Sequence, residues 1–415
     1  MNNEARETKS QQDDEQSTDA IKIASIISAC RTQDMTSLIH HASTSGGFVN
    51  DDLRQQAWPL LLGSEITPSA TKEWTTLPPH KDEDQVGLDV NRSFIYYPSN
   101  PPPSDLSSLK SSLSDLITQT LRLHPSLNYF QGYHDIAQVL LLALGPNLSA
   151  PALARLSLLR IRDFMLPTLS STTTHLDLIP PILFAADEEL CRHLAGLQPF
   201  FALAATLTLF AHEIESYGSI ARVFDYLLST PAVAAVYMFA VIVMLRRDEL
   251  MDIDTSEPEM LYAVLSKLPK GLDVEVLVER AEELRKRFPP EKLPWGAWRK
   301  VSAVSVLKTT ADVKAVREQS LQMGERWLGL LTVEVETAER KKKMIADFKK
   351  RAIKYRRPAG AVTLAVLVGV ISLYLGRNGA MSTSGVLGSL GWARHRLWYT
   401  MNQLLGPWGL YNIDR

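Results

Sequence analysis

The sequence predicts an all-α protein, and three observations lead to that prediction. Apolar residues recur at the helical period of about 3.6 residues through most of residues 20–295. Convincing runs of alternating apolar and polar residues, which are typical of half-buried strands, are absent. Proline or glycine marks the ends of most periodic stretches. With 415 residues, 45% hydrophobic and 22% charged, the chain is long enough for a large folded unit with additional segments.

The first helices follow a polar N-terminal segment. Residues 1–19 contain almost no apolar side chains, so we expect them to be disordered. Helical spacing then begins at residue 20 and predicts a helix that continues to the pair Gly46-Gly47. The next predicted helix covers residues 51–62, because it opens with two aspartates that suit a helix N-terminus and ends before a glycine.

Prolines predict two loops in the next part of the chain, over residues 64–85 and 98–104. A helix over 105–123 follows, with Ser104 or Asp105 as its N-cap. Further helices are predicted over roughly 132–144, 151–164, 186–195, 200–215, 219–229, 232–247, 258–267 and 273–287.

Residues 296–358 change in composition and are predicted to form a basic helical linker. They are rich in lysine, arginine, glutamate and alanine. Their last part, 340–357, holds a dense cluster of lysines and arginines with Asp347 as its one acidic residue. We expect this cluster to contact anionic lipid headgroups, and a solvated linker is the alternative.

An uncharged segment predicts a membrane-spanning helix over residues 359–376. No charged residue lies between Arg357 and Arg377, and the nineteen residues between them would make a helix of ~28 Å, close to the hydrocarbon thickness of the endoplasmic reticulum. A buried core helix is the alternative. The preceding basic cluster would place residues 1–357 in the cytosol. The tail, 377–415, is aromatic and amphipathic, which favours a helix on the far membrane surface or a small folded tail.

Composition and missing motifs exclude several classes of protein. Lys+Arg total 44 against 46 Asp+Glu, so we expect no nucleic-acid partner. Two cysteines, Cys30 and Cys191, are too few for a disulfide framework or a four-thiolate zinc site. The sequence has no P-loop and no nucleophile elbow. We therefore expect no bound cofactor or metal.

Two polar segments between apolar helices suggest a function. Residues 86–92 read VGLDVNR, and residues 129–132 read YFQG. With Arg54 and Trp58 upstream, they resemble the TBC-domain family of Rab GTPase-activating proteins, which carries I-x-x-D-x-x-R and Y-x-Q-G motifs in this order; valine replaces the first isoleucine here. The resemblance covers roughly residues 20–295. It is strongest to the family member that is anchored in the endoplasmic reticulum by a C-terminal transmembrane helix.

The resemblance implies a multi-helix TBC domain that supplies catalytic groups to a Rab GTPase. It implies that Arg92 is an arginine finger and that Gln131 replaces the glutamine of the GTPase. GTP and Mg²⁺ would be bound by the Rab, so the chain would have no hydrolase site of its own. The expected setting is traffic between endoplasmic reticulum and Golgi, on the endoplasmic reticulum membrane, with a single span.

The chemistry of both side chains suits these roles. A guanidinium is always charged and presents a planar fork of donors to phosphate oxygens. Such a finger accelerates hydrolysis by ~10³–10⁵-fold because it stabilises the charge of the transition state. The carboxamide of Gln131 can accept from the attacking water and donate to a phosphate oxygen at once.

Neighbouring residues have supporting roles in this interpretation. Asp89 either positions Arg92 or caps a helix, and Tyr129 is expected to pack against and orient its loop. Gly132 would leave room for the nucleotide of the partner. His134 and Asp135 either contact the partner or serve as core and capping residues. Arg54 and Trp58, upstream, are expected to be architectural.

Two other functions remain open at this level. A catalytically silent TBC-like module could bind a Rab as a scaffold, although both finger residues are present. Alternatively, a membrane-shaping or tethering activity could reside in residues 359–415.

Overall fold

The computed structural model describes residues 19–64, 72–99 and 101–377, and these are helical with no strand among them. The predicted all-α class is confirmed. Residues form two compact units, Met1–Ala338 and Glu339–Arg415. The predictions of a disordered segment over 1–19 and an aromatic tail over 377–415 fall almost wholly outside the described residues.

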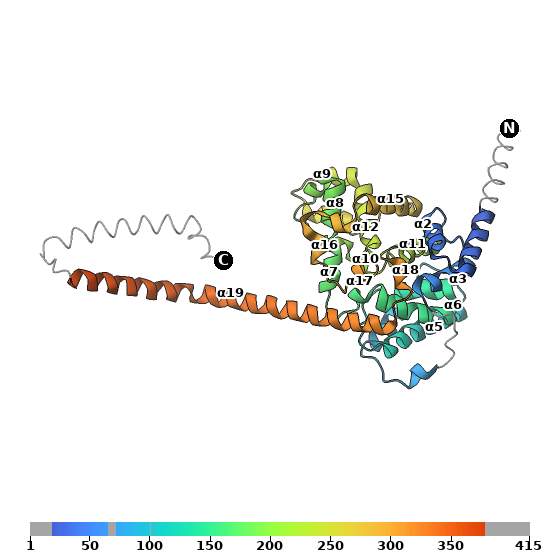
Figure 1. Ribbon diagram of the computed structural model, residues 1–415, viewed down its shortest axis with the longest axis horizontal. Coiled ribbons are helices and arrows are strands. Elements are labelled where there is room, and N and C mark those ends of the chain that lie inside the picture. Colours follow the sequence, from blue (N-terminus) through green and yellow to red (C-terminus); the bar gives the residue numbers. More distant parts are fainter. Residues whose placement is uncertain (1–18, 65–71, 100, 378–415) are drawn as a thin grey trace. The chain divides into compact units, whose positions relative to one another are not determined.

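The helices follow one another through short connections (Figure 1). After a helical segment over 19–32, the elements up to the middle of the chain are α2 (Met35–Ser43), α3 (Asp51–Leu62), η1 (Lys72–Thr76), α4 (Glu83–Asn91), α5 (Pro103–Leu123), α6 (Tyr133–Leu159), η2 (Arg162–Phe164), α7 (Ser170–Leu176), α8 (Ile179–Ala186), α9 (Glu188–His193), η3 (Pro199–Ala202) and α10 (Leu203–Leu207). The remaining elements are α11 (Tyr217–Ser229), α12 (Ala234–Leu245), α13 (Arg247–Met251), α14 (Pro258–Leu265), α15 (Val274–Arg287), η4 (Pro290–Lys292), η5 (Pro294–Gly296), α16 (Ala297–Lys300), α17 (Val306–Thr309), α18 (Val313–Val316) and α19 (Leu321–Arg377).

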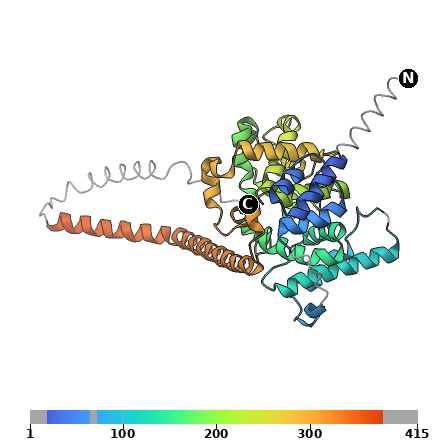
Figure 2. The same cartoon turned by 45° about the vertical axis from the view of Figure 1, so that its right-hand side comes forward.

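Helix α6 is the central element of the first unit. It packs against α3 and α5, which lie beside it in both views (Figure 1, Figure 2). Its length and hydropathy would suffice to cross a membrane, but 61% of its most apolar window is buried inside the unit, as in the core helix of a globular domain. The predicted helices 132–144 and 151–164 correspond to its two parts, which are separated by a kink at Gly145, whose φ of 71° and ψ of 172° are not helical.

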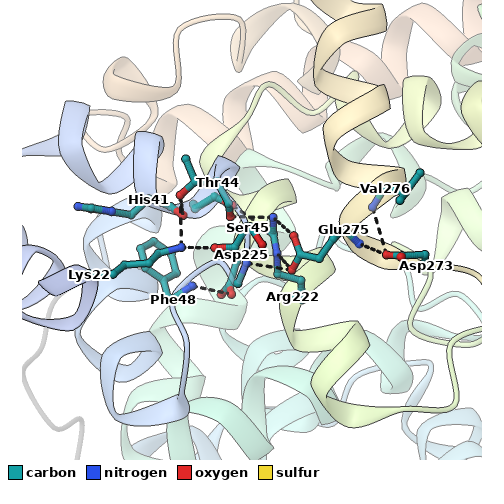
Figure 3. Close-up of polar contacts among 12 residues, drawn as sticks. Lys22, His41, Thr44, Ser45, Phe48, Arg222, Asp225, Asp273, Glu275 and Val276 are labelled. Carbon is teal, nitrogen blue, oxygen red and sulfur yellow. Dashed lines mark hydrogen bonds and ion pairs between the residues drawn. The ribbon is translucent and has the colours of Figure 1, made fainter. Parts of the chain in front are cut away.

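Polar contacts fix the loop between α2 and α3 against α11 and α15 (Figure 3). The Gly46 N–H donates to Glu275 Oε1 at 3.0 Å, and the same oxygen accepts a hydrogen bond from Arg222 Nε at 2.8 Å. The glycine pair is required here. A Cβ on Gly47, at φ 51°, would lie 2.4 Å from a carboxylate oxygen of Asp225.

The buried carboxylate of Asp225 joins three segments of the chain. It accepts from the Phe48 N–H at 3.0 Å, from Arg54 Nε at 3.0 Å and from Trp58 Nε1 at 2.8 Å. All four residues are buried. Arg54 and Trp58 therefore hold α3 to α11, the architectural role expected from the sequence.

Several predicted helices break where tertiary contacts impose another backbone. The helix predicted from residue 20 to Gly46 is interrupted at Gln33, at φ 54°, after which Asp34 caps α2. The helix predicted over 200–215 is reduced to η3 and α10, because Leu209 and Phe210 adopt φ of 51° and 68°.

Boundaries differ elsewhere too. Helix α5 begins at Pro103 with no side-chain cap, instead of at a cap provided by Ser104 or Asp105. The predicted loop 64–85 contains η1 and the start of α4. Helices α7 and α8 lie in a stretch for which the sequence predicted no helix.

The first unit extends well beyond residue 296, where the sequence predicted a linker. Val306, Leu307 and Val316 are buried in short helices, and Leu328 and Leu331 of α19 are buried as well. Arg155 Nη2 donates to three carbonyl oxygens in this segment, those of Val316, Arg317 and Gln319, at 2.9–3.1 Å. The short helices lack a long period, so their contribution to the core was not visible in the sequence.

Candidate functional site

Arg92 lies at the end of α4, where its side chain is exposed. The residue is the C-cap of the helix, and its N–H donates to the carbonyls of Asp89 and Val90. Its side chain is 55% exposed and its guanidinium contacts the carboxylate of Asp89, which is fully buried. The spacing of three residues puts both groups on one helical face. The guanidinium of Arg92 is therefore exposed to solvent while it remains paired with a buried carboxylate.

Asp89 is held by groups from two segments of the chain. Gln85 Nε2 donates to Oδ1 at 3.0 Å, and the hydroxyl of Tyr129 donates to Oδ2 at 2.8 Å. Burial raises the pKa of Tyr129 well above its ordinary value, and the hydrogen bond to Asp89 adds to this rise, so the hydroxyl stays protonated and remains a donor. Tyr129 thus links the turn before α6 to the carboxylate beneath Arg92.

Gln131 and Gly132 form the turn that precedes α6. Gln131 is exposed. The turn is tied to the N-terminus of α4, because the Tyr129 N–H donates to Asp82 Oδ2 at 2.9 Å. Gly132 has φ 101°, and a Cβ there would lie 2.5 Å from Cγ2 of Thr208. Within the chain itself, a close approach to Thr208 accounts for this glycine.

His134 and Asp135 continue the polar network along α6. The hydroxyl of Tyr129 lies 3.1 Å from Nδ1 of His134, whose Nε2 lies 3.3 Å from Asp135. Burial lowers the pKa of His134. Asp135 also contacts Nδ1 of His212 at 2.9 Å, and this hydrogen bond raises the pKa of His212. Sequence reasoning did not link His212 to this site because its partner is 77 positions away.

Arg92 and Gln131 line the same cleft, which has a volume of about 720 Å³. Gly132, His134, Asp135 and His212 also line it, whereas Asp89 and Tyr129 do not. Its rim carries large exposed apolar side chains, Ile95, Tyr96, Leu169 and Phe200. Exposed apolar groups around a polar centre are typical of a surface that binds another protein. No cluster of three or more potential metal ligands occurs in the described part of the chain.

Gln138 is a site residue that sequence reasoning missed. It is buried in α6, and its Oε1 accepts from the Phe94 N–H at 3.0 Å while its Nε2 donates to the Tyr97 carbonyl at 3.4 Å. Phe94 has φ 62°, an unusual value for a bulky residue. The side chain therefore fixes the loop that directly follows Arg92. Its one sequence signal was an amide in an otherwise apolar helical run.

Comparisons with known proteins identify the family of this chain. The family model described as Rab-GTPase-TBC domain matches residues 51–251. TBC1 domain family member 20 of Mus musculus is 32% identical over 329 residues, which cover 77% of this chain and 81% of that protein. GTPase-activating protein gyp10 of Schizosaccharomyces pombe is 33% identical over 290 residues, which cover 68% and 77%. The chain belongs to the Rab-GTPase-TBC domain family, and the resemblance seen in its motifs is confirmed at that level.

A solved structure shares the fold. The crystal structure of the Ypt/Rab-GAP domain of Gyp1p aligns with a TM-score of 0.50 and 16% identity, covering 64% of this chain and 99% of that one. At this identity the likeness concerns the fold alone. The helical TBC architecture therefore agrees with the family assignment made from the sequence.

Proposed function

We propose that this chain accelerates GTP hydrolysis by a Rab GTPase and that Arg92 and Gln131 supply the catalytic groups in trans. The observation that carries the proposal is that both side chains are exposed and line one cleft, although they come from different elements. Membership of the Rab-GTPase-TBC domain family supports Rab GTPase activation, as does the likeness to a relative named as a GTPase-activating protein. GTP and Mg²⁺ are bound by the partner.

The geometry suits an arginine that acts on a bound partner. In the transition state, negative charge accumulates on the phosphate oxygens, and a guanidinium from outside stabilises it. Asp89 limits the orientations of Arg92 before docking, which lowers the entropy lost on binding. Because Asp89 is fully buried and Arg92 is 55% exposed, the carboxylate stays in the domain while the guanidinium reaches the partner.

Gln131 complements that charge without adding another. Its carboxamide oxygen can orient the attacking water by accepting a hydrogen bond from it, while its NH₂ group donates a hydrogen bond to an oxygen of the γ-phosphate. Tyr129, in the turn that carries Gln131, donates hydrogen bonds to Asp82 and Asp89 of the α4 segment. The positions of Gln131 and Arg92 therefore depend on the same set of contacts.

The test is GTP hydrolysis by a panel of purified Rab GTPases with the full chain in detergent. Arg92→Ala should remove most of the stimulation, since an arginine finger contributes ~10³–10⁵-fold. Gln131→Ala should also reduce it. Arg192→Ala is the matched control. Arg192 is an exposed helical arginine that forms an ion pair with Glu188, with 2.5 Å between Nη2 and Oε1, and it does not line the cleft. The proposal fails if no Rab is stimulated or if the Arg92 and Arg192 variants behave alike.

We also propose that residues 359–376 anchor the chain in the endoplasmic reticulum membrane with the TBC domain in the cytosol. The support is the uncharged sequence between Arg357 and Arg377 and the basic cluster before it. Confinement beside a lipidated Rab raises the effective concentration of both proteins, which suits an activator in traffic between endoplasmic reticulum and Golgi.

Two experiments on microsomes test the anchor and its orientation. Alkaline carbonate should leave the chain in the membranes, and its extraction would refute the anchor. Protease added to intact microsomes should digest the N-terminal domain, and protection of that domain would refute the orientation.

A further inference from the structure

Three large apolar side chains are exposed on a strongly basic part of α19. Met344, Ile345 and Phe348 have exposed fractions of 66%, 52% and 72% within the second unit. The segment around them, 340–357, is the basic cluster. Isolated exposed apolar residues need no explanation, but several in one register on a charged helix do.

The three side chains share one helical face. At 3.6 residues per turn, positions 344, 345 and 348 lie within about 100° of one another, and Ala352 and Tyr355 take positions in the same sector. Most cations occupy the rest of the circumference, including the exposed Lys343 and Lys350. Lys341 falls within the apolar sector, where its aliphatic stem can lie along the surface with its charge at the edge.

We propose that this face of residues 340–357 lies on an anionic lipid surface with the helix axis parallel to it. The inference rests on the proposed membrane location and specifies which residues contact lipid. A helix with a narrow apolar face and a broad basic face binds such surfaces by burying the apolar groups while its cations meet the headgroups.

The alternative is a helix that stands upright on the membrane. At about 1.5 Å per residue, it would hold Phe348 ~15 Å and Met344 ~21 Å from Pro358, where the uncharged segment begins. Both distances exceed the Debye length of ~8 Å, so the cations there would gain little from the lipid and the apolar groups would stay in water. Proline at position 358 removes a helical hydrogen bond, which makes a bend at this point inexpensive.

A second copy of the chain would bind this face less favourably than anionic lipid. Two such helices would bring basic residues together across a narrow apolar seam, and like charges at that distance repel. Anionic lipid complements both features of the segment, its charge and its exposed apolar groups.

The experiment uses the full chain in vesicles of phosphatidylcholine with or without phosphatidylserine. Cys30 and Cys191 are replaced by alanine, and a single cysteine at Phe348→Cys carries an environment-sensitive fluorophore. Ala346→Cys is the matched control, since it is exposed on the opposite side of the same turn. With phosphatidylserine, emission at 348 should shift to shorter wavelength and acrylamide quenching should fall at least ~2-fold, with no change at 346.

Equal responses at the two positions would overturn the proposal. So would protection of position 348 that needs no phosphatidylserine and rises with protein density, because that would indicate a second copy. Flotation and carbonate extraction of the same vesicles report on the anchor. Stimulation of soluble Rab reports on GTPase activation, so a failure of either proposed function is recognised separately.

Discussion

Replacing Gln138 by leucine should slow catalysis more than it weakens docking. Leucine has a similar volume but leaves the buried N–H of Phe94 without its acceptor at 3.0 Å. An unsatisfied buried donor costs about 1–3 kcal/mol. The loop after Arg92 can relieve that cost only by moving, and a displaced finger loses transition-state contacts. If the whole cost appears in the barrier, kcat falls by about 5- to 150-fold.

The assay is GTP hydrolysis by a stimulated Rab, with kcat and KM determined separately and with melting temperature measured for each variant. Thr310→Val is the matched control, because Thr310 is buried and accepts from the Ala232 N–H at 2.8 Å without lining the cleft. Both variants should lose stability, but only Gln138→Leu should lose kcat. Equal kcat values for the two variants at a temperature well below both melting points would refute the reasoning.

Other predictions test single contacts of the site. Tyr129→Phe removes a donor to buried Asp89, which should cost about 1–3 kcal/mol, visible as lower kcat at unchanged KM; a changed KM alone would contradict a positioning role. Because the folded pKa of His212 is raised, its stabilising contribution is full below its unfolded pKa of about 6.5 and is lost as pH rises through the folded pKa. The melting temperature of wild type should therefore exceed that of His212→Gln at about pH 5.5 and match it at about pH 8. Gly132→Ala should destabilise by about 1–3 kcal/mol through its φ of 101° and a clash with Thr208, and adding Thr208→Ser should restore part of the loss in a denaturant titration.

The elements that were predicted well are those whose own sequence determines them. Helices α11 and α15 have a clear apolar face and were placed within two residues. Leu209 and Phe210 show the limit of such reasoning. Their sequence is a helical apolar run, yet both adopt positive φ in the folded chain. Packing around them overrides local preference.

The same contrast holds for the functional site, where residues in local motifs were visible in the sequence and residues with distant partners were not. Arg92 and Gln131 could be selected from the sequence because each lies in a short contiguous motif, and both side chains line one cleft. Gln138 and His212 were missed because their partners lie 44 and 77 positions away. Contacts over such separations exist only in the folded chain, and one sequence has no signal for them.

The extent of the domain was underestimated for a related reason. Residues 297–318 form helices of four residues each, too short for a hydrophobic period. Their burial depends on polar contacts with distant groups: Asp163 accepts from the Val306 N–H at 3.0 Å, and Arg155 binds the carbonyls that follow α18. The charged composition of this stretch suggested a helical linker.

The central claim is that Arg92 and Gln131 complete the catalytic site of a partner in the transition state. The most direct measurement is the affinity of the chain for a Rab bound to GDP and Mg²⁺, with and without aluminium fluoride as a mimic of the transferring phosphoryl group. Transition-state analogues bind ~10²–10⁸-fold more tightly than ground-state ligands, so wild type should bind much more tightly when fluoride is present, and Arg92→Ala should lose that gain. Equal affinity with and without aluminium fluoride, or an undiminished gain in the Arg92 variant, would contradict the account.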